Sequence, residues 1–332
     1  MTGDLTAWSW LLADVMGQPA WMWALFLGIV VLLLVLDLGV FHRHARAIGV
    51  RESLKMSAGY IIAGLAFGVW VWFAVGEQSA AEYFTGFIVE KSLALDNIFV
   101  ISLIFAHFAI PAAYQHRVLF WGILGVIVLR GIMIGFGAVL VAQFSWVLYV
   151  FAVFLALTGL KMLFVGSHTP DIGESRVLSL LRRVVNVTPQ PHGDRFFVRL
   201  PNANTGKMAL WATPLFAALV MIEIADLIFA IDSIPAIFAI STDPFVVYTS
   251  NIFAILGLRA LYFALAAVID RFVYLKQALA LVLIFIGGKI FFADLMGWEK
   301  FPPTISLLVT LGLLAGGIAY SMLRSRPKTA IS

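Results

Sequence analysis

The sequence has no cysteine and few charged residues. Without cysteine the chain forms no disulfide and offers no thiolate ligand, so any metal site in it is built from oxygen or imidazole groups. Only 12% of the 332 residues are charged and 62% are hydrophobic, whereas about 25% are charged in a typical soluble protein. This composition excludes a water-soluble fold. No soluble catalytic motif is present, so we expect neither an enzyme nor, despite the net charge of +4, a nucleic-acid-binding protein.

Long apolar runs dominate the chain. About 20 apolar residues in a helix cross the roughly 30 Å hydrocarbon core of a bilayer. Nine such runs lie at 21–41, 56–75, 83–107, 118–142, 146–166, 212–240, 246–268, 274–293 and 304–323. They predict an all-α polytopic membrane helix bundle, in which about nine transmembrane helices form a single integral membrane domain within the lipid bilayer.

The basic residues of the connecting segments predict how the chain is oriented. Sixteen of these cations fall on the same side of the predicted spans, and only Lys300 falls on the other. Cytoplasmic loops carry the excess of Lys and Arg, so we expect a multi-pass protein of the inner membrane with its N-terminus outside and its C-terminus in the cytoplasm. The first 20 residues contain no Lys or Arg, which favours a retained first span over a cleaved signal peptide.

The longest polar stretch, 167–207, is cytoplasmic in this arrangement. Within it, residues 175–187 place Arg182 and Arg183 opposite three aliphatic side chains. We expect a linker helix on the membrane surface, with a regulatory or partner-binding role as the alternative.

Two of the apolar runs are interrupted by polar and charged side chains. These are Glu90, Lys91, Asp96 and Asn97 in the third run and Glu223, Asp226, Asp232 and Ser233 in the sixth. A charged residue at the bilayer centre costs about 2.5–3.5 kcal/mol on insertion scales. Five carboxylates would not persist facing lipid, so we expect them to face the bundle interior or a wet cavity.

Carboxylate, amide and hydroxyl oxygens suit a hard or borderline divalent cation such as Mn²⁺, Mg²⁺ or Ca²⁺. The predicted ligands are Asp96, Asp226 and Asp232 at the centre, Glu90 and Glu223 as ligands or proton carriers, and Asn97 and Ser233 completing the shell. The alternative is that the acids form buried ion pairs with basic residues and only hold the bundle together. We favour such a structural role for the basic residues themselves, because their charge opposes a bound metal. They are Lys91, Arg130, Lys161, Arg259 and Lys289.

Asp37 stands near the cytoplasmic end of the first span, just before a cluster of two histidines and an arginine. We expect an interfacial carboxylate paired with that cluster, and a cytoplasmic gate is the alternative.

The chain also contains an internal repeat. GVIVLRG, with Arg130, matches ILGLRA, with Arg259; TGLKMLF, with Lys161, matches IGGKIFF, with Lys289, at nearly equal spacing. The two units are 83–166 and 208–293, preceded by two spans in 21–75 and followed by the span 304–323. A unit of three spans reverses the orientation of its copy, so we expect an inverted repeat, an architecture typical of transporters. Pro235 predicts a helix break beside Asp232.

At these residues the sequence resembles a known family. The segments EKSLALDN, IEIADLIFAIDSIPAIFAISTDP and YTSNIFAILGLRALYF, with HGDRFFVR and DLGVFHR, are similar to the TerC/Alx family of bacterial integral membrane proteins, within the LysE-like transporter superfamily. The resemblance runs from about 37 to 324. It implies manganese efflux, with some members named for tellurite resistance or described as redox modulators, and it places the family's transmembrane acids at the five acidic positions above.

The sequence therefore predicts a divalent cation exporter, with Mn²⁺ the favoured substrate and no permanent cofactor. It would work by alternating access, with proton coupling as an open question. One alternative is a TerC-type membrane scaffold for metal loading of secreted proteins or stress resistance, without transport of its own. Another is an organic-solute exporter of the LysE type.

Overall fold

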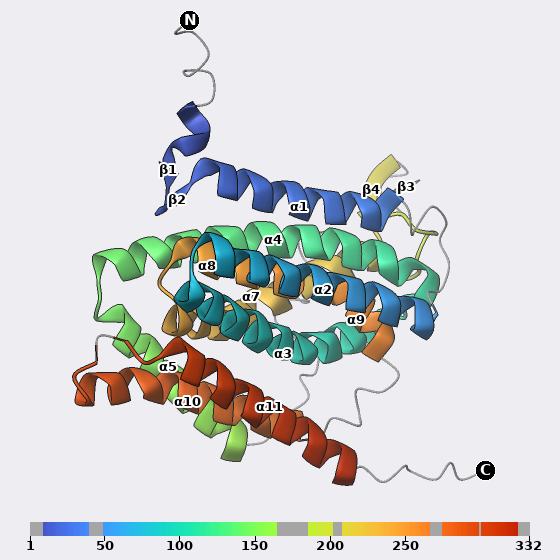
Figure 1. Ribbon diagram of the computed structural model, residues 1–332. Coiled ribbons are helices and arrows are strands. Elements are labelled where there is room, and N and C mark those ends of the chain that lie inside the picture. Colours follow the sequence, from blue (N-terminus) through green and yellow to red (C-terminus); the bar gives the residue numbers. More distant parts are fainter. Residues whose placement is uncertain are drawn as a thin grey trace, which may run out of the picture.

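The computed structural model describes residues 9–39, 49–164, 185–201, 208–265, 274–298 and 300–324. Helices form nearly all of it (Figure 1). Their bounds are α1 Ala20–Gly39, α2 Val50–Ala74, α3 Glu77–His107, α4 Ala112–Gln143, α5 Val147–Phe164, α7 Pro214–Ile240, α8 Pro244–Ile255, α9 Leu258–Leu265, α10 Leu275–Leu295 and α11 Pro303–Arg324. The prediction of an all-α polytopic bundle is confirmed.

Length and composition select seven segments of the described chain as candidates to cross a bilayer. They are Val50–Ala74, Ala112–Gln143, Val147–Phe164, Pro214–Ile231, Pro244–Ala264, Lys276–Leu295 and Pro303–Arg324. The stretch Ala20–Leu36 of α1 is apolar but shorter. Helix α3 is continuous, but charged side chains such as Glu90 and Lys91 interrupt its apolar sequence. The total of nine spans therefore stays a prediction.

Large apolar side chains cover the outside of the bundle. Phe73 is 85% exposed, Phe136 is 70% exposed and Ile132 is 66% exposed. Exposure of such a surface to water is unfavourable, whereas contact with lipid tails is not, because a helix that is apolar all round requires an apolar environment. This surface agrees with a protein embedded in the membrane.

The helices form two groups in Figure 1. Helices α5, α10 and α11 lie together along one side, and the other helices form the larger group. Helix α3 packs against both α7 and α8, and α4 packs against α7 and α8. Helix α8 is buried along almost its whole length, which makes the interface of α3, α4, α7 and α8 the interior of the bundle.

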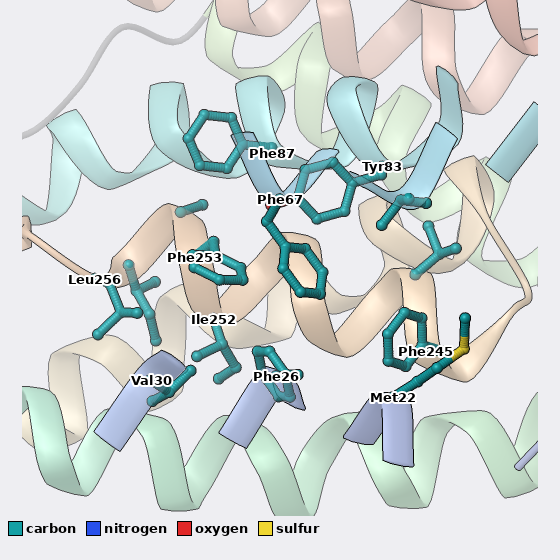
Figure 2. Close-up of a cluster of buried hydrophobic side chains, with 14 of the residues drawn as sticks. Met22, Phe26, Val30, Phe67, Tyr83, Phe87, Phe245, Ile252, Phe253 and Leu256 are labelled. Atoms are coloured by element: carbon teal, nitrogen blue, oxygen red, sulfur yellow. The ribbon is translucent and has the colours of Figure 1, made fainter. Parts of the chain in front are cut away.

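An aromatic cluster fixes α3 and α8 in this interior. Figure 2 shows Phe26 of α1, Phe67 of α2 and Phe253 of α8 gathered beneath Tyr83 and Phe87 of α3. The rings of Phe67 and Phe253 have centroids 4.7 Å apart, a spacing at which aromatic pairs attract each other. The Tyr83 hydroxyl donates a 2.9 Å hydrogen bond to the carbonyl of Gly64 on α2. The cluster therefore holds α3 and α8 in a fixed relation.

Helices α5 and α10 approach each other at a glycine on each side. A methyl group on Gly159 would lie 2.6 Å from the carbonyl oxygen of Ala280, and one on Gly287 would lie 2.5 Å from the carbonyl oxygen of Ala152. Each contact is the counterpart of the other if the two helices are equivalent. An internal two-fold repeat predicts such reciprocity, although the repeat itself stays a prediction.

The predicted helix break at Pro235 is wrong. Helix α7 continues through Pro235 to Ile240, because the loss of one backbone donor is tolerated where the flanking residues Ile234 and Ile237 are buried. The break lies instead in the predicted span 246–268. There α8 ends at Ile255 and α9 begins at Leu258, with Gly257 at a φ of +78°, a conformation that glycine adopts without strain.

Two short sheets lie outside the helices, and sequence reasoning predicted neither. Residues Asp14–Val15 (β1) pair with Gln18–Pro19 (β2), after a short 3₁₀ helix at Ser9–Leu12. In the segment 167–207 and just beyond it, Phe197–Pro201 (β3) pairs antiparallel with Met208–Ala212 (β4). Most of the expected surface helix at 175–187 lies outside the described residues, so that expectation is untested.

Candidate functional site

A buried arginine joins carboxylates from the two predicted repeats. Arg130 of α4 is 1% exposed, Glu90 of α3 is 2% exposed and Asp226 of α7 is 6% exposed. The Arg130 guanidinium meets Asp226 side-on, with Nη2 at 3.1 Å from Oδ1 and Nε at 3.2 Å from Oδ2. Its Nη1 donates to Glu90. Bidentate contact of this kind fixes both charge and orientation.

Amide and hydroxyl groups complete the shell around these three charges, the central cluster. Asn97 Nδ2 donates to Asp226 Oδ1 at 3.2 Å, and Ser233 Oγ accepts from Arg130 at 3.4 Å. Both residues were predicted for the site. Asn251 of α8 was not, yet it donates to Glu90 at 3.1 Å and accepts from Arg130 at 3.3 Å. Asn251 has no exposed surface in the structure, whereas in the sequence it is a single amide within an apolar run.

Glu223 lies beside the cluster, three residues before Asp226 and therefore on a neighbouring part of the same helical face. Its carboxylate rests against Gly125 of α4, where any larger residue would collide with it. The Oε2 atom is buried and has no hydrogen-bond partner among the described residues. A buried carboxylate oxygen without a donor requires a water, a proton or a cation to satisfy it.

Lys91 binds backbone carbonyl oxygens in the described part of the structure, and its predicted ion pair stays a prediction because the side chains of Asp96 and Asp232 are not described. Its Nζ donates to the carbonyl oxygens of Ala254 and Leu256, at 2.8 and 3.1 Å. These carbonyls lie at the end of α8, where the helix break removes their intrahelical donors. A cation is favourable at this end because the helix dipole is negative there.

The other predicted basic residues lie apart from one another. Lys161 is exposed on α5, and Arg259 is buried on α9. Lys289 of α10 donates to the Ser306 hydroxyl of α11 at 3.0 Å. The side chains of Asp37, Asp96 and Asp232 lie outside what the structure describes, although their backbones belong to α1, α3 and α7.

The cluster offers oxygen ligands and an excess of negative charge. Two carboxylates and one guanidinium leave one negative charge, and Glu223 adds a second beside it. Among the side chains that the structure describes, no three His, Cys, Asp or Glu residues form a metal-binding group. Asp96 and Asp232 are outside this search, so the predicted ligand set stays a prediction. Carboxylate, amide and hydroxyl oxygens are the donors that hard divalent cations prefer.

Comparison with known proteins agrees with the resemblance noted in the sequence. The model of the integral membrane protein TerC family matches residues 75–329. An uncharacterized membrane protein of Rickettsia bellii is 50% identical over 302 residues, which cover 91% of this chain and 97% of the relative. A membrane protein of Escherichia coli, named as a proposed membrane-bound redox modulator, Alx, is 42% identical over 310 residues, which cover 91% of this chain and 94% of the relative.

An uncharacterized membrane protein of Myxococcus xanthus is 46% identical over 310 residues, which cover 93% of this chain and 94% of the relative. No solved structure matches. The family match spans both predicted repeats and every residue of the central cluster. The chain therefore belongs to the TerC family of integral membrane proteins.

Proposed function

We propose that the protein exports a divalent metal cation, with Mn²⁺ as the favoured substrate. The observation that carries the proposal is the convergence of Glu90 and Asp226, from two different helices, on one buried point within an apolar bundle. Burying such groups is expensive. Residues of this kind in membrane proteins line ion pathways more often than lipid-facing surfaces. The resemblance to the TerC/Alx family favours manganese and supplies the direction of transport.

In this proposal Arg130 acts as the counter-charge of the carboxylates in the part of the transport cycle in which no metal cation is bound. A divalent cation that reached Asp226 and Glu223 would compete with the guanidinium for carboxylate oxygens. Its arrival would release Arg130 from Asp226, while Glu90 and Asn251 retain it. Competition between a fixed cation and a mobile one links occupancy of the site to the packing of α3, α4 and α7, and alternating access requires such a link.

The test is manganese flux into proteoliposomes that contain the purified protein, with and without an imposed proton gradient. We expect the wild-type protein to give flux above that of empty liposomes. The variant Asp226→Asn should lose this flux, and so should Asp96→Asn and Asp232→Asn, which change the two predicted ligands whose side chains lie outside the described structure. A proton-coupled exporter gives flux that follows the gradient. No flux from a folded protein under either condition would overturn the proposal.

Glu77→Gln is the matched control for these variants. Glu77 lies at the exposed start of α3, so the change removes one carboxylate without touching the central cluster. It should transport as the wild type does. Loss of flux in Glu77→Gln as well would show that the assay reports general damage.

A second candidate follows from the relatives named for a proposed redox role. This chain has no cysteine and so supplies no thiol couple of its own, and a role in stress resistance would then act through a partner protein. Such a scaffold predicts that the cellular phenotype survives neutralisation of the acids and is lost when the segment 167–207 is removed. The cation exporter predicts the opposite result.

A further inference from the structure

A second polar site lies at the end of the bundle that the charge distribution predicts to be external. It is a cavity of about 220 Å³ between α3, α5, α7, α10 and α11. Its polar lining includes Glu82, Ser241, Thr242, Lys289 and Lys300. The cavity is separate from the central cluster, because neither Glu90 nor Asp226 lines it.

Glu82 is the buried carboxylate of this outer cavity. It is only 4% exposed, and it accepts hydrogen bonds from the Ser241 hydroxyl and, at 3.3 Å, from Gln78. Lys300, whose side chain is 46% exposed, pairs with it at 3.2 Å. Glu82 thus connects α3 with the turn after α7 and with the segment before α11. Two cations line the cavity with Glu82: Lys300 faces solvent and can move away at little cost, whereas Lys289 is buried and donates to Ser306.

The outer cavity and the central cluster are linked along the interface of α3 and α7. Glu82, Gly86 and Glu90 follow one another at four-residue spacing on α3, which places them on one face of the helix. On α7, Ser233 and Ile237 have the same spacing, and Ser241 follows four residues later, directly after the helix ends at Ile240. Eight residues of helix span about 12 Å. Each series is therefore polar at both ends and apolar in the middle.

The apolar middle of this path is closed in the structure. A methyl group on Gly86 would lie 2.5 Å from Cδ1 of Ile237 and 2.9 Å from Oγ of Ser250. Ile237 is 2% exposed, so its side chain fills the space that the glycine leaves. No water fits between Gly86 and Ile237 at a contact this close, because a passage for water needs a gap of its own.

We propose that the outer cavity is the exit vestibule of the transport route and that Ile237, seated against Gly86, is its closed gate. Glu82 is the carboxylate that a departing divalent cation meets after the gate, once Lys300 has moved away. This inference rests on the proposed cation transport. The series of side chains on α3 and α7 shows where the route runs, and the Gly86–Ile237 contact shows that this conformation is shut toward the outer cavity.

The absence of native cysteine permits a direct test by single-cysteine labelling. Ser233→Cys places a thiol behind the gate, where the native side chain is 2% exposed, and Thr242→Cys places one at an exposed position in the cavity. A membrane-impermeant thiol reagent is added to the outside of intact cells. We expect rapid labelling of Thr242→Cys and slow labelling of Ser233→Cys. Adding Ile237→Ala should accelerate the labelling of Ser233→Cys by about tenfold or more, because this change removes packing from the closed state only.

Ile237→Val is the matched control, because valine fills nearly the same space at the gate as isoleucine. In this variant the labelling of Ser233→Cys should stay slow. Equal labelling rates of the two thiols with Ile237 intact would show that there is no gate. Failure of Ile237→Ala to change the rate in a folded protein would place the route elsewhere. If the reagent labels Thr242→Cys only from the cytoplasmic side, the proposal that the outer cavity is an exit vestibule is overturned. None of these readouts requires manganese flux, so they stand apart from the test of the proposed function.

The role of Glu82 has its own readout. Mn²⁺ added outside should slow the labelling of Thr242→Cys, because Thr242 follows the residue that binds Glu82. Glu82→Gln should abolish this protection, and Lys300→Gln should strengthen it by removing the competing cation. Absence of protection at any Mn²⁺ concentration would overturn Glu82 as a cation ligand.

Discussion

Arg130 carries the charge balance of the central cluster, because it contacts both Glu90 and Asp226 where almost no water reaches them. Buried ion pairs add little stability compared with apolar packing, but the loss of one partner is costly because the other charge stays buried. The two carboxylates therefore depend on this guanidinium whenever no other cation is bound.

We predict that Arg130→Gln lowers the free energy of unfolding by about 3–5 kcal/mol, since it leaves two buried carboxylates without a counter-charge. Thermal unfolding of the purified protein in detergent measures this. The double variant Arg130→Gln/Asp226→Asn should recover part of the loss, and Lys161→Gln, at an exposed position on α5, should change little. An Arg130→Gln protein as stable as the wild type would contradict this account of the cluster.

The sequence was sufficient to place Glu90, Glu223 and Asp226 toward the bundle interior, where Glu90 and Asp226 are buried and Glu223 is partly buried, because the cost of a carboxylate in lipid leaves few other placements. It was not sufficient to find Asn251, because a single amide in an apolar run has no periodic pattern. The hydrogen-bond acceptors of Lys91 were also not predictable from the sequence. Its carbonyl acceptors become available only where α8 ends, and that end was not predicted.

At the scale of elements, the end of α8 is the least expected feature. Lys91→Met keeps the length of the side chain but removes the donor to Ala254 and Leu256. We expect a loss of about 1–3 kcal/mol in the free energy of unfolding, the typical cost of leaving buried polar groups unsatisfied. Denaturation in detergent, with Lys161→Met as the control, measures it. Equal effects of the two variants would contradict the role of Lys91 in binding the free carbonyls at the end of α8.

The contact of α5 with α10 gives a second prediction. Gly159→Leu and Gly287→Leu should each destabilise the protein by about 1–3 kcal/mol or more, because each inserts a side chain against a backbone carbonyl. The two effects should be similar if the helices are equivalent. Gly288→Leu is the control, since nothing lies within 4 Å of a methyl group there. Unfolding at the same temperature for all three variants would contradict the close approach.

The positions of the helices were predictable because apolar runs of transmembrane length have few other structures open to them. Their interruptions were not. Pro235 lies in a helix that packing keeps continuous, whereas Gly257 marks a true break. Glycines also serve close packing, as Gly159 does, so the residue type alone does not distinguish a break from a contact. The β3–β4 pair was missed because β3 lies in a stretch whose prolines and charges indicated a linker, and β4 lies just beyond that stretch.

At the scale of the whole molecule, the charge of the connecting segments predicts the orientation. Lys300→Cys should react with an impermeant thiol reagent added outside intact cells, and Arg199→Cys should react only after the membrane is opened. Both residues lie in described segments outside the helices. The reverse pattern would place the outer cavity in the cytoplasm and contradict export through it.

In the proposed function the carboxylates around Arg130 bind a divalent cation. The most direct test is Mn²⁺ binding to the purified protein, followed by the paramagnetic resonance signal of free Mn²⁺. We predict saturable binding that weakens by about tenfold or more in Asp226→Asn and is unchanged in Glu77→Gln. Wild-type affinity in a folded Asp226→Asn protein, or no binding by the wild type, would contradict the account.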